Sequence, residues 1–298
     1  MAEAAVGVIG GSGLYHIEGF VGTTEVDVDT PFGKPSDRIV VGELAGVRIA
    51  FLPRHGRGHR IGPSEIPQRA NIYAMKALGV ERLISVSAVG SMREGIHPLD
   101  MVVPDQIFDR TTLRPHTFFT DGIVAHVGLA DPYCSELSDH LATAAEQVGP
   151  TIHRGGTYVC IEGPQFSTRA ESRIYRQWGV DVIGMTAMPE ARLAREAEMC
   201  YATLAVVTDY DVWHEASGPV TVEQVVANLG KNVKAAQEAL KRLLPTLPAR
   251  SACSCSSALA HSIVTAPNLI PPEARQRLGL LIDKYVSAVP SENTETHC

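Results

Sequence analysis

The sequence predicts an α/β fold in which a mixed, largely parallel central β-sheet is flanked by helices. Short apolar runs rich in Val and Ile end in Gly, Ser, His or Asp and alternate with helical patterns, as in sheets covered by helices. A chain of 298 residues with 45% hydrophobic and 20% charged residues suits one large globular domain. No internal repeat breaks this alternation, so a solenoid is not expected.

The strands of this sheet are predicted from the apolar runs, each of which is followed by polar residues, proline or glycine. In chain order the runs are Val6–Ile9, Arg48–Leu52, Arg82–Val86, Met101–Val103, Thr157–Ile161, Val180–Ile183 and Cys200–Val207.

The strongest helical pattern runs from Val222 to Leu244, where apolar residues recur three or four positions apart. Pro245 and Pro248 follow it, and both resist continuation of a helix. The composition changes at this point. We therefore predict one main domain over residues 1–250 and a C-terminal extension over residues 251–298 that packs on it. The extension contains a predicted amphipathic helix, Pro272–Val286, and its last residues are expected to be disordered.

The charge balance excludes several classes of partner. A net charge of -7 argues against binding of nucleic acid or an anionic membrane surface. No apolar run reaches the ~18 residues of a membrane span, and no basic segment precedes the first apolar run, so we expect a cytoplasmic protein.

The six cysteines are too dispersed for a disulfide scaffold, and most are expected to be buried thiols. Cys253 and Cys255 form a close pair that could be redox-active, a strained disulfide or part of a metal site. Because no second cysteine or histidine pair stands at the spacing of a zinc finger, no metal is predicted.

Two carboxylates, Asp209 and Asp211, follow the run Cys200–Val207 at the point where a buried strand opens into a loop. In open α/β sheets the ligand crevice lies beyond the carboxyl ends of the strands. Burial and a like-charged neighbour raise a carboxyl pKa, so one acid can donate a hydrogen bond while the other accepts. Adenine presents the matching acceptor N7 and donor amine side by side. The alternatives are an N-cap pair and a hard-cation site.

Possible anion donors follow four other runs. Ser12 lies in a glycine-rich turn, Arg54 and His55 open a basic stretch, and Ser87 with Ala88 begins a small-residue turn. Thr186 supplies a further hydroxyl. Arg54 is predicted to hold phosphate by two parallel hydrogen bonds, with His55 donating a third. A tight strand exit without a ligand and a solvated basic loop are the alternatives.

Two apolar residues near these exits are ambiguous. Met185 precedes Thr186, and Phe166 follows the run Thr157–Ile161. Either residue could be ordinary core, and Phe166 could also cover the face of a base.

Taken together, the motifs resemble the purine nucleoside phosphorylase superfamily, and within it the S-methyl-5′-thioadenosine phosphorylase branch. The resemblance extends from about Val6 to Leu244. Its segments are GGSGLY, DTPFGKPSD, RHGRGH, SAVGSMRE, FDRTTLRP, IEGPQFSTRAES, GMTAMPE and TDYDVW.

This resemblance implies that phosphate attacks the anomeric carbon of a nucleoside, releasing the base and a sugar 1-phosphate. Phosphate is then a co-substrate, and no cofactor is needed. Asp209 is the expected general acid toward N7 of the base. The implied phosphate-binding residues are Ser12, Arg54, His55, Ser87, Ala88 and Thr186; the base-binding residues are Phe166, Asp209 and Asp211.

The resemblance also implies a site for the 5′ group of the substrate. Met185 is expected to pack on the ribose, and Val222, Val225 and Val226 to form an apolar wall that suits a methylthio group. His126 is expected from a neighbouring subunit, which implies a homotrimer or a dimer of trimers. Cys253 and Cys255 resemble the CXC disulfides of thermostable relatives. Some of those relatives accept more purines, so a broader purine nucleoside phosphorylase acting on adenosine, inosine or guanosine is the alternative. Two positions depart from the family pattern, Gly184 where asparagine is usual and Ser12 where threonine is common.

Overall fold

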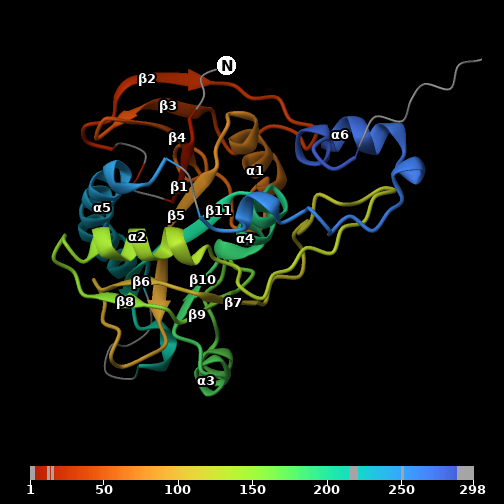
Figure 1. The fold of residues 1–298 in the computed structure, drawn as a ribbon. Coiled ribbons are helices and arrows are strands. Elements are labelled where there is room, and N and C mark those ends of the chain that lie inside the picture. Colours follow the sequence, from red (N-terminus) through yellow and green to blue (C-terminus); the bar gives the residue numbers. More distant parts are fainter. Residues whose placement is uncertain (1–3, 12–13, 15–16, 215–220, 250–251, 287–298) are drawn as a thin grey trace, which may run out of the picture.

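One mixed sheet forms the centre of the protein, with helices on both faces (Figure 1). The computed structural model describes residues 4–11, 14, 17–214, 221–249 and 252–286, without the side chains of Val222 and Gln224. Within these residues the sheet has 11 strands. The predicted fold class is confirmed.

The strands include all the predicted apolar runs, with small shifts at their ends. Four strands, β2, β3, β7 and β8, were not predicted. β2 and β7 lie at the two ends of the main strand order and are largely exposed, which removes the apolar signal. β8 is only three residues long and partly exposed, whereas β3 is largely buried and was missed despite its apolar residues. The strands are β1 Val6–Gly10, β2 Val21–Val26, β3 Ile39–Leu44, β4 Val47–Pro53, β5 Arg82–Ser91, β6 Met101–Val103, β7 Gln106–Asp109, β8 Ile152–Arg154, β9 Thr157–Cys160, β10 Val182–Gly184 and β11 Cys200–Asp209.

The strand β5 organises the sheet. It pairs in parallel with β1 on one side and with β11 on the other, and near its end it pairs antiparallel with β10. The main strand order is β2-β3-β4-β1-β5-β10-β9-β7. A branch leaves it at β5, where β11 pairs with β5, β6 pairs with β11, and β8 pairs with β6. Because β1, β4, β5 and β11 run in parallel, their carboxyl ends meet at one edge.

The helices form a layer on each face of the sheet, with α2 and α5 on one face and α1 and α4 on the other (Figure 1). The helix predicted from Val222 is confirmed, and it ends one residue early at Leu243. The C-terminal helix is also confirmed, and it ends four residues before the predicted Val286. The helices are α1 Gln68–Ala77, α2 Ser135–Ala145, α3 Arg169–Gln177, α4 Ala187–Glu196, α5 Val222–Leu243 and α6 Pro272–Ile282.

The C-terminal extension joins the main core. Leu278 and Ile282 of α6 are fully buried in the same cluster as Met75 of α1. The boundary at residue 250 stays a prediction, and residues 287–298, predicted to be disordered in part, lie outside the described residues. In the described part of the chain, no helix is long and apolar enough to cross a membrane.

Candidate functional site

A cavity of about 530 Å³ opens at the edge where the parallel strands end, and we call it the nucleoside cavity. The exits of β1, β4, β5, β10 and β11 line it together with α5. The fold thereby brings together most of the predicted site residues. Those that line the cavity are Arg54, His55, Ser87, Ala88, Phe166, Met185, Thr186, Asp209, Asp211, Val225 and Val226.

Three predicted site residues are not among those lining the cavity. Ser12 lies outside the described residues, and Val222 is the first residue of α5, with its side chain undescribed. His126 is exposed on another part of the surface, where its backbone amide donates to the carbonyl of Ser262 at 2.8 Å.

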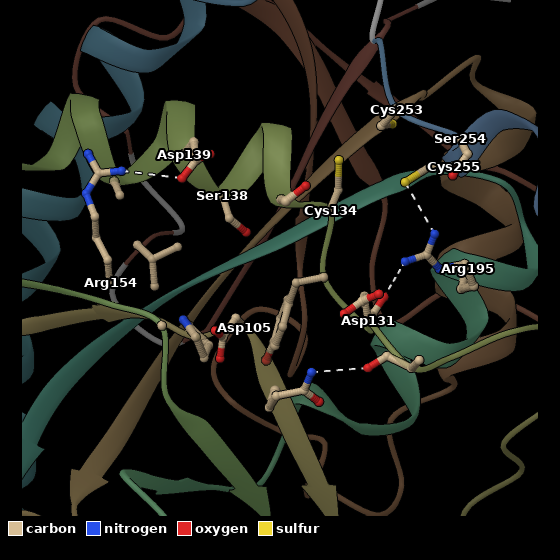
Figure 2. Close-up of a pocket in the computed structure, with 18 of the residues that line it drawn as sticks. Asp105, Asp131, Cys134, Ser138, Asp139, Arg154, Arg195, Cys253, Ser254 and Cys255 are labelled. Carbon is tan, nitrogen blue, oxygen red and sulfur yellow. Dashed lines mark hydrogen bonds and ion pairs between the residues drawn. The ribbon is translucent and has the colours of Figure 1, made fainter.

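A second and larger cavity, of about 880 Å³, lies elsewhere on the fold, and we call it the thiol-lined cavity (Figure 2). It is bounded by the N-terminus of α2, the exits of β6 and β8, and the segment 253–255. Figure 2 shows Cys134, Cys253 and Cys255 at one end of it and Arg154 at the other.

The acid pair is held at the end of β11 by an irregular backbone. The pairing register with β5 shifts between Val207 and Asp209, and Asp211 adopts a left-handed φ of 52°. This lets the Asp211 amide donate to Oδ1 of Asp209 at 2.8 Å. Gly90 is required opposite, since a Cβ there would lie 2.8 Å from that same Oδ1. A left-handed non-glycine residue is strained, and such strain is common at functional sites.

Asp209 is placed to hold a proton. Burial is the main cause that raises its pKa. The Thr208 hydroxyl donates to Oδ2 of Asp209 at 2.7 Å, and the Asp211 amide donates to Oδ1; both hydrogen bonds oppose this rise. Burial outweighs them, so the pKa of Asp209 stays above its ordinary value.

Asp211 accepts hydrogen bonds from two serine hydroxyls, whereas Asp209 accepts from one threonine hydroxyl. Burial raises the pKa of Asp211, and hydrogen bonds from Ser172 and Ser167 oppose this rise. Ser172 stands in the first turn of α3, whose start is fixed by a capping box between Thr168 and Glu171. Sequence reasoning assigned no role to these two serines, although both lie in the segment IEGPQFSTRAES. Their position beside a capping box could have marked their hydroxyls as candidates for the site.

Two hydroxyl groups in the cavity are buried and have no hydrogen-bond partner among the described residues. These are Oγ of Ser87, inside β5, and Oγ1 of Thr186, just after the neighbouring strand β10. An unpaired buried hydroxyl is costly, so a ligand with oxygen acceptors fits here. The predicted anion donors Ser87 and Thr186 thus face one cavity.

Arg54 is used differently from the sequence prediction. Its guanidinium is fully buried and forms a two-point ion pair with Glu190, at 3.0 Å from Nε and 3.2 Å from Nη2. Nη2 also donates to Ser85, and Nη1 donates to the carbonyl of Val86. The predicted two-point grip on phosphate is therefore wrong, because one Nη1 hydrogen remains for a ligand. Glu190, which the sequence analysis did not single out, accepts the two parallel hydrogen bonds from Nε and Nη2 instead.

His55 also departs from its predicted role. Burial and the neighbouring Arg54 lower its pKa to about 4, so the ring is neutral at pH 7. Its Nδ1 lies 2.9 Å from the carbonyl of Ile61, which can only accept, so Nδ1 carries the hydrogen. Nε2 is then an acceptor. The predicted donation from His55 to phosphate is wrong for this tautomer, and the ring instead suits the hydroxyl of a protonated phosphate.

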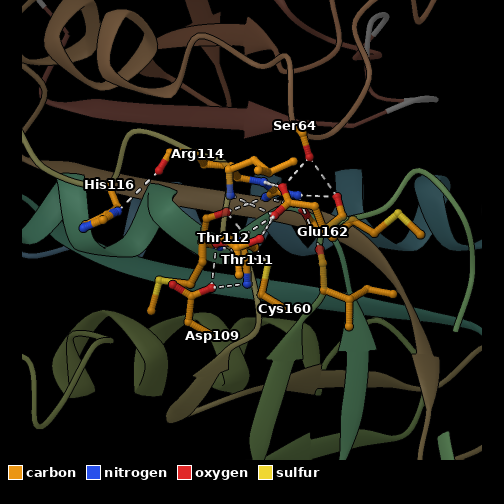
Figure 3. Close-up of polar contacts among 12 residues, drawn as sticks. Ser64, Asp109, Thr111, Thr112, Arg114, His116, Cys160 and Glu162 are labelled. Carbon is orange, nitrogen blue, oxygen red and sulfur yellow. Dashed lines mark hydrogen bonds and ion pairs between the residues drawn. The ribbon is translucent and has the colours of Figure 1, made fainter. Parts of the chain in front are cut away.

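A network around Arg114 fixes the turns that carry Met185 and Phe166 (Figure 3). Arg114 Nη1 donates to the carbonyls of Met185 and Met188 at 2.7 and 2.6 Å, and Nε donates to Glu162 at 3.0 Å. Burial alone would raise the pKa of Glu162, but hydrogen bonds from Ser64, two backbone amides and Arg114 lower it to about 2. Arg114 lies in the segment FDRTTLRP, but its role depends on contacts across the fold that the sequence does not reveal.

The opposite side of the cavity is apolar. Val225, Val226 and Leu229 of α5 form a wall, and Phe166 is 45% exposed at the rim. The departure at Gly184 has a steric reason, because any Cβ there would overlap the hydroxyl of Tyr158. The protein therefore excludes the usual asparagine and keeps a tyrosine behind the cavity.

Comparison with known proteins gives consistent results. Residues 5–245 match the sequence model of the phosphorylase superfamily. The chain is 55% identical to the S-methyl-5′-thioadenosine phosphorylase of Gloeobacter violaceus, over 97% of this chain and 98% of that protein. It is 54% identical to the enzyme of the same name from Geobacter sulfurreducens, over 95% and 100%.

Solved structures are similar as well. A methylthioadenosine phosphorylase from an antarctic soil metagenomic library superposes with a TM-score of 0.89 at 50% identity, covering 95% of this chain and all of that one. The methylthioadenosine phosphorylase of Schistosoma mansoni in complex with adenine gives 0.80 at 36% identity, covering 87% and 98%.

Proposed function

The chain belongs to the phosphorylase superfamily, and on this premise we propose that it is a pentosyltransferase that cleaves S-methyl-5′-thioadenosine with phosphate. The products are adenine and S-methyl-5-thioribose 1-phosphate. Relatives that share more than half of its residues over nearly the full length carry the name of this activity, which supports the proposal.

One observation carries the proposal. A buried acid pair, Asp209 and Asp211, and two unpartnered buried hydroxyls, Ser87 and Thr186, line the same cavity. The acids suit a 6-aminopurine, because a protonated carboxyl donates to N7 and an ionised one accepts from the amine. The hydroxyls suit an oxyanion.

The proposed reaction needs one proton transfer. Asp209 donates its proton to N7, the bond between N9 and the anomeric carbon breaks with its electrons passing to the base, and a phosphate oxygen bonds to that carbon. Phosphate charge beneath the sugar stabilises the oxocarbenium-like transition state. Ser87, Thr186 and the remaining Arg54 hydrogen hold the phosphate, while Nε2 of His55 accepts from its hydroxyl. The backbone amide at Ala88 is a further proposed donor, and no cofactor or metal enters this step.

The 5′ group is proposed to lie against Val225 and Val226, with Met185 against the ribose. Such a wall disfavours a 5′-hydroxyl, since burying an unpaired polar group is costly. His126 is proposed to complete this end from a neighbouring subunit, because it lies away from the cavity of its own chain. The assembly is then a homotrimer or a dimer of trimers, acting in purine and methionine salvage in the cytoplasm.

The proposal is tested by following adenine release from S-methyl-5′-thioadenosine with and without phosphate. Release that depends on phosphate is expected, and release without it would indicate a nucleosidase instead. Adenosine, inosine and guanosine in the same assay separate this function from a broad purine nucleoside phosphorylase. Equal turnover of the 6-oxopurines would favour the broad enzyme.

A further inference from the structure

Four cysteines from separate parts of the sequence meet at one end of the thiol-lined cavity. They are Cys134, Cys200, Cys253 and Cys255, and we call them the thiol cluster. Their sulfur atoms all lie within 4.8 Å of one another, and all but Cys253 are buried. No disulfide joins the cysteines in the described part of the chain.

We propose that the thiol cluster is a structural zinc site in which four cysteine sulfurs hold one Zn²⁺. Structural zinc sites are tetrahedral with Zn–S bonds of about 2.3 Å, which places the sulfurs about 3.8 Å apart. The sulfurs of Cys200 and Cys253 lie 3.3 Å apart, and the others fall within 4.8 Å. Shifts of about 1 Å or less bring all four into this range.

Two of the ligands stand on the rigid part of the fold. Cys134 precedes α2 as its N-cap, and Cys200 is the first residue of β11. The backbone amide of Cys134 donates to the carbonyl of Tyr201 at 2.8 Å, and the amide of Cys200 donates to the carbonyl of Glu81 at 2.8 Å. These bonds fix the two cysteines side by side before any metal arrives.

The other two ligands come from the segment that follows α5. Glu136 accepts from the amides of Ala252 and Cys253, at 2.8 and 3.0 Å, and so fixes this segment against α2. One residue separates Cys253 from Cys255, fewer than the two to four usual between zinc ligands. The chain turns into a short 3-10 helix at Cys255, which brings both sulfurs to the cluster. The sequence predicted no metal because the second cysteine pair, Cys134 and Cys200, is assembled only by folding.

The surroundings suit the charge of such a site. Zinc displaces four thiol protons, giving a complex with a net charge of -2 and releasing those protons to solvent. Arg195 Nη1 lies 3.4 Å from the sulfur of Cys255, and the N-terminus of α2 faces Cys134. Cys134, Cys253 and Cys255 line the 880 Å³ cavity, which gives the ion a route of entry (Figure 2). A bound ion would tie the segment after α5 to α2 and β11.

The test uses the full chain, reduced and held without oxygen, then incubated with Zn²⁺ or Co²⁺ and freed of unbound metal. We expect about one zinc ion per chain by elemental analysis, and with cobalt the sulfur-to-metal charge-transfer band of a tetrahedral thiolate site. Cys255→Ser is expected to lower zinc affinity at least about tenfold, measured by competition with a chelating dye. Cys160→Ser is the matched control, because Cys160 is buried on β9 outside the cluster.

A second measurement uses the wild-type chain, so it still tests the proposal if Cys255→Ser does not fold. In the wild-type chain, Zn²⁺ is expected to protect the four clustered cysteines from alkylation, as mapped by mass spectrometry, and a chelator to remove that protection. The proposal is overturned if the reduced chain binds no zinc, if Cys160→Ser loses as much zinc as Cys255→Ser, or if native disulfides hold the cluster and zinc does not bind after their reduction. None of these measurements depends on nucleoside turnover.

Discussion

The larger of the two cavities is not the one that holds the proposed reacting groups. The thiol-lined cavity measures about 880 Å³ and the nucleoside cavity about 530 Å³. Both contain buried hydroxyls without a hydrogen-bond partner among the described residues. The smaller one lies where parallel strands end and adds buried acids and a neutral histidine. The larger one adds thiols and exposed ion pairs. The protonation of the lining groups, more than volume, identifies the proposed reaction site.

The largest effect is expected from Asp209→Asn, because an amide cannot protonate N7. Turnover of S-methyl-5′-thioadenosine should fall by about 10²- to 10⁴-fold. Inosine should gain relative to adenine nucleosides, because its 6-oxo group suits an amide. In the wild type, activity should decline as pH rises through the raised pKa of Asp209, because the protonated form is the active one. Unchanged turnover in the variant would mean that Asp209 is not the acid.

The next effect contrasts a buried ion pair of the nucleoside cavity with an exposed pair of the thiol-lined cavity. Glu190→Gln leaves the buried Arg54 charge without its counter-ion and should lower the free energy of unfolding by about 3–5 kcal/mol. Glu146→Gln removes one of two carboxylates paired with the solvent-exposed Arg154 and should leave the free energy of unfolding nearly unchanged. Chemical denaturation of both variants measures the difference. Equal effects would refute the role assigned to Arg54 and Glu190.

A smaller effect concerns the pH dependence of stability through His55. Its pKa is about 4 in the fold against the ordinary 6.5 of histidine, so between these values the unfolded chain binds the proton and the folded chain does not. Stability from this group is therefore complete above pH 6.5 and declines as pH falls toward 4, by about 3 kcal/mol.

His55→Asn supplies the reference for this measurement, because its amide can donate to the carbonyl of Ile61 and does not titrate. The free energy of unfolding of the wild type, measured relative to this variant, should decrease from pH 6.5 to pH 4. A difference that stays constant over this range would show that His55 is not buried in its neutral form.

The smallest effect compares one unpartnered hydroxyl from each cavity. Thr186→Val keeps the shape but removes a proposed phosphate donor, so KM for phosphate should rise about tenfold. Ser138→Ala removes a similarly unpartnered hydroxyl from the thiol-lined cavity and should leave KM unchanged. Steady-state kinetics at varied phosphate checks both. An increase in KM for Ser138→Ala alone would reverse the assignment of the two cavities.

The predicted site residues that lie together in the fold are those next to the ends of apolar runs. Asp209, Ser87 and Thr186 each follow or end a buried apolar run, and parallel strands bring such ends together whatever their sequence separation. Apolar periodicity also gave α5, since its buried face repeats along one element. The exposed edge strands β2 and β7 lack such a repeating buried face and were missed, as were β3 and β8.

The fold class, most of the strands whose ends line the nucleoside cavity and the acid pair at the end of β11 could be predicted from the amino-acid sequence. These follow from local patterns, because hydrophobic periodicity and strand exits are properties of short segments. The partners of polar and charged side chains became visible only in the folded chain. Glu190 pairs with Arg54, Ser167 and Ser172 with Asp211, and the four cysteines with one another. Hydrogen bonds and ion pairs act over a few ångströms in space. Their partners here lie up to 136 residues apart, so what a charged or polar side chain does is settled by folding.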